Sequence, residues 1–231
     1  RANFTGDFEQ RAQRQAEVVA ALGKVLPPHA LLYTPEDTTP YECDGLTAYR
    51  QHPLCVALPE TEAQVQQVLK ACHRMGVPVV ARGAGTGLSG GAMPHAQGVT
   101  LSMAKFNQIV SVDAHTRTAV VQCGVRNLAI SEAAAPLGLY YAPDPSSQIA
   151  CSIGGNVAEN AGGVHCLKYG LTTNNILGLE VVLMGGDIVR LGGKHLDSEA
   201  YDLLGLMTGS EGLLGVITEV TVRILQKPSV A

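Results

Sequence analysis

The chain has 231 residues, of which 46% are hydrophobic and 16% are charged, and its formal net charge at pH 7 is −4. This length is enough for one large core or two small ones. The charge and the lack of a basic cluster argue against a nucleic-acid partner, and no apolar run has the length of a membrane span or opens the chain as a signal peptide.

Residues 1–53 are predicted to form an N-terminal helix followed by an arm. The spacing of apolar residues favours a helix over residues 7–26, and Pro27 and Pro28 would end it. A loop rich in Pro and Thr follows, which we expect to run over the surface.

Residues 54–105 show the order strand, helix, strand, glycine-rich loop, strand, which predicts a small α/β subdomain. Thr61 and Gln64 have the spacing of a capping box at the start of the helix. Gly76 fits the position just after its end. We expect this unit to hold the glycine-rich loop in place.

The glycine-rich loop follows an apolar strand, and five of the ten residues 82–91 are glycine. Glycine lets the backbone take positive φ and approach a ligand, and successive N–H groups can then form a concave nest for an anion. A P-loop would need Lys and Ser or Thr after its last glycine, but Gly90 is followed by Gly91 and Ala92. The P-loop interpretation therefore fails.

Residues 85–90 do match the G-x-G-x-x-G dinucleotide fingerprint, but that motif must open a helix. Here Pro94 and Gly98 interrupt, and residues 99–103 favour another strand. We therefore predict that the loop binds a diphosphate through backbone amides alone. A glycine-rich hairpin without a ligand is the alternative.

Residues 106–225 are predicted to form an antiparallel sheet with inserted helices. Alternating residues indicate one hairpin over 109–122 and another over 177–191, and a strand near residues 220–224. A short helix is expected at residues 127–135, ended by Pro136. The fold class is thus α+β, with a small α/β subdomain and an antiparallel subdomain.

Three further stretches in this part are rich in glycine or proline, namely residues 143–147, 152–163 and 209–217. One glycine-rich turn is weak evidence for a ligand. Four such stretches in one chain indicate a long, flat ligand that the backbone approaches from several sides.

These four stretches, in this order, resemble the FAD-binding domain of the vanillyl-alcohol oxidase and p-cresol methylhydroxylase type. Residues 124–131, 140–152 and 162–170 are similar to the FAD subunits of bacterial glycolate oxidases. The resemblance runs from about Tyr41 onward and implies an FAD cofactor. Some members attach FAD through a histidine in the first loop, where Thr86 stands here, so non-covalent binding is implied.

The resemblance assigns part of FAD to each stretch. The pyrophosphate would lie on Ala81, Arg82, Gly83, Ala84, Gly85, Thr86, Gly87, Leu88 and Ser89. The flavin and ribityl chain would meet Pro143, Asp144, Ser147, Ser152, Gly154, Gly155, Asn156, Glu159, Asn160 and Gly162. The adenosine end would meet Glu211, Gly215, Val216 and Ile217, largely through main-chain groups.

The resemblance also implies a reaction. It is the transfer of a hydride from the α-carbon of a small 2-hydroxy acid, glycolate or D-lactate, to flavin N5. Electrons would leave through partner subunits, one of them an iron–sulfur protein, in the cytoplasm or at the inner membrane through those partners. A substrate-binding cap domain would follow, with residues 226–231 as the start of its linker, and the present chain alone is expected to be inactive.

Two other functions stay open from the sequence: a nicotinamide-dependent dehydrogenase and a non-catalytic nucleotide-binding scaffold. Single residues also leave alternatives. Arg82 could pair with phosphate or point away from it, and Asp144 could reach the ligand or fix a turn. His165 and Lys168 could place positive charge beside the flavin or serve the scaffold and the surface, and Glu211 could bind the ribose or cap a turn.

The six cysteines show no C-x-x-C pair and no zinc-like spacing. We predict reduced, mostly buried thiols and no metal site.

Overall fold

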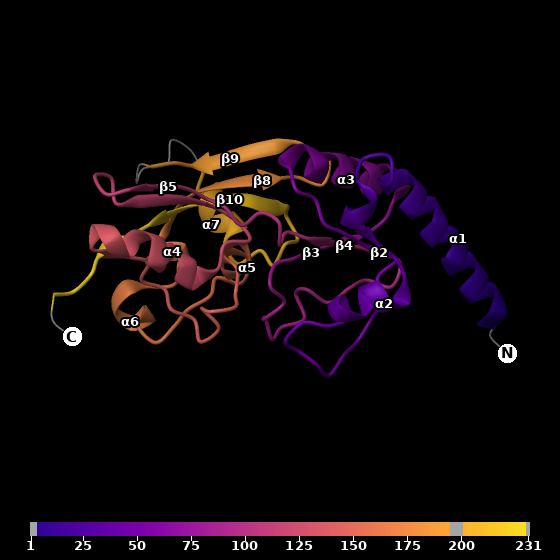
Figure 1. The fold of residues 1–231 in the computed structure, drawn as a ribbon, viewed down its shortest axis with the longest axis horizontal. Coiled ribbons are helices and arrows are strands. Elements are labelled where there is room, and N and C mark those ends of the chain that lie inside the picture. The colour runs from indigo at the N-terminus through magenta and orange to yellow at the C-terminus, as the bar shows by residue number, and fades with distance from the viewer. Residues whose placement is uncertain (1–3, 195–200, 230–231) are drawn as a thin grey trace. The chain divides into compact units, whose positions relative to one another are not determined.

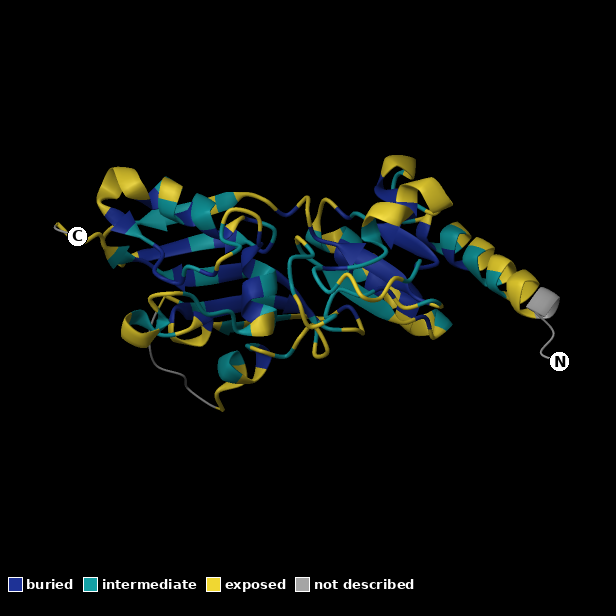
Figure 2. Ribbon diagram, turned by 90° about the horizontal axis from the view of Figure 1, so that it is seen from below, coloured by how far each residue is buried: buried dark blue, intermediate teal, exposed yellow. Residues whose placement is uncertain are grey.

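The computed structural model describes residues 4–194 and 201–229, and the chain divides into two compact units (Figure 1). The first unit comprises Arg1–Lys105 and Met184–Asp187, and the second comprises Phe106–Leu183 and Ile188–Ala231. In each unit the buried residues gather on the strands (Figure 2). None of the helices in the described ranges is long and apolar enough to cross a membrane.

The first unit contains a four-stranded sheet in the order β1-β2-β4-β3. Strand β4 pairs in parallel with both β2 and β3, and β1 is antiparallel to β2. The strands are β1 (Leu31–Leu32), β2 (Cys55–Ala57), β3 (Val79–Arg82) and β4 (Val99–Ser102), and the helices are α1 (Phe4–Leu22), α2 (Pro35–Thr38) and α3 (Glu62–Met75). Strand β4 is buried along its whole length, so the core of this unit lies at the centre of the sheet.

Helix α3 forms where its end signals predicted. The Thr61 side chain accepts a hydrogen bond from the backbone N–H of Gln64 at 3.2 Å, and Gly76 ends the helix at φ +62°. The Gln64 side chain accepts from the N–H of Glu60 at 2.7 Å, one residue before the cap that the pattern indicated. Both ends are therefore satisfied by local hydrogen bonds.

Helix α1 ends at Leu22, four residues before the predicted end. Gly23 follows it, and glycine is a poor helix former, so residues 23–26 continue as turns. Val18 and Leu22 are buried. The side chain of Arg14 donates to the carbonyl of Met75, which ties α1 to the end of α3.

The second unit contains a five-stranded antiparallel sheet in the order β5-β6-β10-β8-β9. The strands are β5 (Ile109–Asp113), β6 (Thr118–Gln122), β8 (Ile176–Val182), β9 (Ile188–Gly192) and β10 (Val216–Arg223), and a separate pair joins β7 (Leu139–Tyr140) to β11 (Leu225–Gln226). Both predicted hairpins are confirmed. The last long strand, β10, lies in the middle of the sheet.

In the described residues, four α-helices accompany this sheet, namely α4 (Asn127–Ala134), α5 (Ile153–Glu159), α6 (Cys166–Tyr169) and α7 (Leu203–Met207). Residues 152–163 differ from the glycine-rich turn that their composition predicts, because residues 153–159 form the helix α5. The reason is packing: a Cβ atom on Gly154 would lie 2.7 Å from the Cβ of Cys123. Gly154 thus lets the helix approach the end of β6. There the backbone N–H of Gly154 donates a hydrogen bond to the carbonyl of Cys123 at 2.8 Å.

The six cysteines are free, and Cys55, Cys72, Cys123 and Cys151 are buried. Burial raises the pKa of Cys55 to about 12 and that of Cys72 to about 11. These groups therefore stay protonated and act as small apolar core residues.

Candidate functional site

The predicted diphosphate loop of the first unit leaves β3 and reaches β4 without forming a helix. Gly85 and Gly90 have φ values of +71° and +81°, which favour glycine. Leu88 in this loop is 75% exposed. The loop thus turns at two left-handed glycines, and the helix that a dinucleotide fingerprint requires is missing between these strands.

The Arg82 side chain lies against the N-terminal arm. Its Nη1 donates to the carbonyl of Cys43 at 2.7 Å, and its guanidinium carbon is 5.5 Å from the ring centre of Tyr41. A Cβ atom on Gly85 would lie 2.3 Å from the Arg82 Nη2. Burial lowers the pKa of Arg82. Electrostatic interactions with the neighbouring Cys43, Tyr41 and Asp44 act in the opposite direction and raise it in part.

The candidate residues Ala81 and Arg82 end β3, and residues 83–89 form the loop. In the second unit the candidates lie on three segments. They are Pro143, Asp144 and Ser147 after β7; Ser152, Gly154, Gly155, Asn156, Glu159, Asn160 and Gly162 on α5 and its flanks; and Glu211, Gly215, Val216 and Ile217, of which the last two already belong to β10.

Asn127, which is not among the predicted site residues, joins two of these segments. Its side-chain Nδ2 donates to the carbonyl of Pro143 and its backbone N–H donates to that of Cys151, both at 3.1 Å. Asn127 is buried at the first position of α4. The sequence signal was an asparagine at a predicted helix start; its burial, which requires hydrogen-bond partners, is visible only in the folded chain.

The segment before β10 is held by the C-terminal half of α5. The backbone N–H groups of Gly209 and Glu211 donate to the carbonyls of Val157 and Ala158 at 2.8 and 2.9 Å. Glu211 has a φ of +55°, a backbone conformation that costs free energy in a residue with a side chain. The structure thus brings the second and third candidate segments together and holds one of their residues in a strained conformation.

Two buried polar side chains on α5 and its N-cap have no partner in the described part of the chain. They are Ser152, through Oγ, and Asn156, through Nδ2, and both residues are about 5% exposed. Leaving a buried donor unpaired costs about 1–3 kcal/mol. Side chains of this kind, beside a helix with two glycines in its first turn, fit a polar ligand with several hydrogen-bonding groups, as FAD is.

Asp144 and His165 form a hydrogen-bonded pair. Asp144 Oδ2 lies 2.6 Å from His165 Nδ1, and Asp144 Oδ1 accepts from the His165 backbone N–H at 3.2 Å. A Cβ atom on Gly163 would lie 2.3 Å from the Asp144 carbonyl oxygen. The pair therefore fixes the turn before His165, and a glycine at 163 is what allows the close approach.

The pair lines a cavity of about 420 Å³ together with Tyr140, Tyr169 and other residues of the second unit. Burial, and next its hydrogen bond to Tyr169, raises the pKa of Tyr140 to about 12. The same hydrogen bond lowers the pKa of Tyr169, and a hydrogen bond to Lys168 is the next largest cause of this decrease. The Lys168 Nζ lies 5.0 Å from the ring centre of Tyr169, so this corner holds a cation beside two hydroxyl groups that are hydrogen-bonded to each other.

Known proteins share both sequence and fold with this chain. It is 61% identical over 217 residues, or 94% of its length, to the glycolate oxidase subunit GlcD of Escherichia coli (strain K12), of which it spans 44%. It is 44% identical to a D-lactate dehydrogenase of Archaeoglobus fulgidus, covering 73% of this chain and 38% of that one. The chain spans less than half the length of these relatives.

A solved structure of alkyldihydroxyacetonephosphate synthase matches with a TM-score of 0.82 and 21% identity, covering 93% of this chain and 41% of that one. This likeness supports the two-subdomain α+β fold. The family model described as an FAD binding domain matches residues 53–192, more than half of the chain. Because this match covers more than half of the chain, the chain belongs to the FAD-binding domain family.

Proposed function

We propose that this domain carries the FAD of an oxidoreductase that acts on a small 2-hydroxy acid, with glycolate first and D-lactate as the alternative. The observation that carries the FAD part is the pair of buried, unpartnered groups on Ser152 and Asn156. The names of the relatives, a glycolate oxidase subunit and a D-lactate dehydrogenase, support the substrate class. The chemistry that FAD supplies when bound is acceptance of a hydride at flavin N5.

The residues of the chain would bind and orient the cofactor. In the first unit, the backbone N–H groups of residues 83–89 would donate to the diphosphate, which needs no lysine cluster. In the second unit, Ser152 and Asn156 would donate to the flavin and ribityl region, and residues 211–217 would meet the adenosine end. Asp144 would fix the orientation of His165, and Lys168 would add positive charge close by.

We also propose that electrons leave through partner subunits, one of them carrying an iron–sulfur cluster, and that the protein works in the cytoplasm or at the inner membrane through these partners. The resemblance to glycolate oxidase FAD subunits supports this proposal. We further propose that the base that removes the hydroxyl proton lies in the cap domain that the resemblance implies, within a longer protein of the length of the relatives, of which this chain spans less than half.

The test of the substrate class is an anaerobic mixture of each acid with the longer protein and, separately, with the FAD-loaded 231-residue chain. Glycolate is expected to bleach the flavin absorbance of the longer protein within its turnover time, and the 231-residue chain is expected to stay oxidised. A longer protein that neither acid bleaches would contradict the proposed substrates. Rapid bleaching of the short chain, lost in His165→Ala, would place the base in this domain.

FAD is expected to be held without a covalent bond, because Thr86 stands where some relatives of this type carry the attaching histidine. Precipitation with acid unfolds the protein and releases a non-covalent cofactor. Flavin absorbance should therefore appear in the supernatant, and yellow protein in the washed pellet would contradict the prediction.

A further inference from the structure

We infer that residues 41–46, here called the strap, form a second layer behind the diphosphate loop and set the position of its backbone. The inference rests on the proposed role of residues 83–89 in binding diphosphate. It concerns residues that neither the loop pattern nor the predicted FAD contacts include, and all of them lie in the first unit.

The strap lies against the loop through backbone contacts. A Cβ atom on Gly45 would be only 2.6 Å from the carbonyl oxygen of Gly87 and 2.8 Å from that of Thr86. Real Cβ atoms essentially never come this close to backbone, so Gly45 is the residue that lets the two segments touch. Any side chain there would push the loop at the two positions where it is expected to face the diphosphate.

Asp44 ties the strap to the far end of the loop. Its side chain is almost fully buried, with 5% of the residue exposed. Oδ1 accepts from the backbone N–H of Leu46 at 2.9 Å, and Oδ2 accepts from that of Ala92 at 3.4 Å. One carboxylate thus bridges the strap and the end of the loop, and the attraction to the nearby Arg82 charge offsets part of the cost of burying it.

Arg82 ties the strap to the start of the loop. It donates to the carbonyl of Cys43 and lies over the ring of Tyr41. Because Arg82 ends β3, the strap is fixed at both ends of the loop, by Arg82 before it and by Asp44 after it. A loop held at both ends and supported in the middle keeps its N–H groups in place before a ligand arrives, which lowers the entropy cost of binding.

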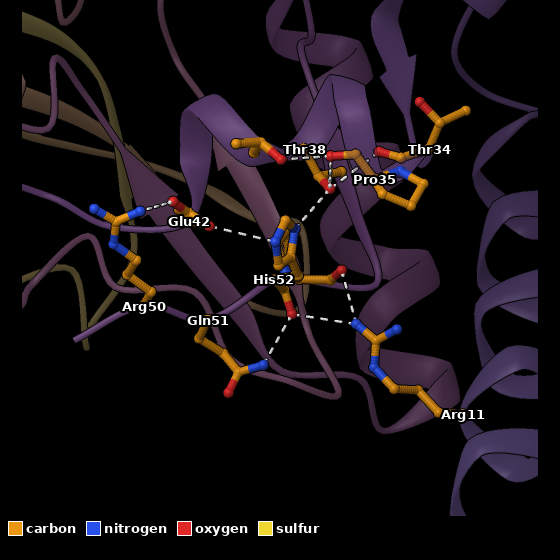
Figure 3. A network of polar contacts seen from close by, with 10 residues as sticks. Arg11, Thr34, Pro35, Thr38, Glu42, Arg50, Gln51 and His52 are labelled. Atoms are coloured by element: carbon orange, nitrogen blue, oxygen red, sulfur yellow. Dashed lines mark hydrogen bonds and ion pairs between the residues drawn. The ribbon is translucent and has the colours of Figure 1, made fainter.

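The strap is itself anchored to the first helix by a polar network (Figure 3). Glu42 pairs with Arg50 at 2.8 Å and with His52 at 3.3 Å, and His52 also contacts the Thr38 hydroxyl at 3.1 Å. The carbonyl of His52 accepts from the side chain of Arg11 on α1 at 3.2 Å. These hydrogen bonds and ion pairs therefore connect the strap, which contacts the loop, to helix α1.

The experiment compares Gly45→Ala with Gly76→Ala in the FAD-binding chain. Both add one methyl group to the first unit, but a Cβ on Gly76 meets nothing within 4 Å and only strains a left-handed residue. Gly76→Ala should lower the melting temperature and leave FAD affinity unchanged. Gly45→Ala should weaken FAD about tenfold, and ADP by the same factor in competition, while riboflavin, which has no diphosphate, should bind as before.

Asp44→Asn is the second variant, and it keeps the inference testable if Gly45→Ala does not fold. The amide retains one acceptor for Leu46 but turns an N–H toward that of Ala92, so FAD and ADP should again weaken together. Unchanged FAD and ADP affinity in both variants, or a loss for riboflavin as large as for ADP, would overturn the inference. An unaltered chain that binds FAD but not ADP would instead contradict the proposed diphosphate role of the loop.

Discussion

Replacing Asn156 with leucine is expected to make the FAD-free domain more stable and its binding of FAD weaker. The Asn156 Nδ2 is buried without a partner in the described residues, and leucine has the same number of side-chain heavy atoms with the same branching, although its methyl groups are bulkier. Removing an unsatisfied buried donor should raise the free energy of unfolding by about 1 kcal/mol. The lost hydrogen bond to the cofactor should lower FAD affinity about tenfold.

Urea unfolding of the FAD-free protein and a fluorescence titration with FAD measure the two effects. Thr100→Val is the matched control, because Thr100 Oγ1 in β4 is also buried without a partner but is not a proposed cofactor contact. The control should gain stability and keep its FAD affinity. If Asn156→Leu also keeps its affinity, the amide does not bind FAD.

The two adjacent glycines of α5 are expected to respond to alanine with opposite signs. A Cβ on Gly154 would lie 2.7 Å from the Cβ of Cys123 and 3.1 Å from its carbonyl oxygen. Gly154→Ala should therefore push α5 from the end of β6 and cost about 1–3 kcal/mol of stability. A Cβ on Gly155 meets only the Ser152 Oγ, at an ordinary 3.5 Å, so Gly155→Ala should gain up to about 1 kcal/mol from helix propensity.

FAD binding separates the proposed roles of these two residues. Gly155→Ala, despite its added stability, should weaken FAD if the cofactor lies against that backbone. Gly154→Ala should weaken FAD by displacing Ser152 and Asn156, which are on the same helix and its cap. Equal stability changes for the two variants in urea would contradict the packing argument, and unchanged FAD affinity in Gly155→Ala would remove it from the proposed site.

Elements with strong local signals could be predicted from the sequence. The caps at Thr61 and Gly76 bound α3, and alternation along β5, β6, β8 and β9 gave both hairpins, because these patterns act between residues near one another in the chain. The absence of a helix after the glycine loop also followed locally, from Pro94 and Gly98. The cofactor class followed from the glycine-rich stretches, because their order resembles that of a known type of FAD-binding domain.

Long-range contacts fixed the remaining features, and no local pattern encodes them. Residues 153–159 are helical although two glycines oppose it, because Gly154 packs on Cys123, about 30 residues earlier. The direction of the Arg82 side chain depends on Cys43 and Tyr41 in the arm. The burial of Asn156 without a partner is likewise visible only when the chain has folded around it, since the same residue type on a surface would bond to water.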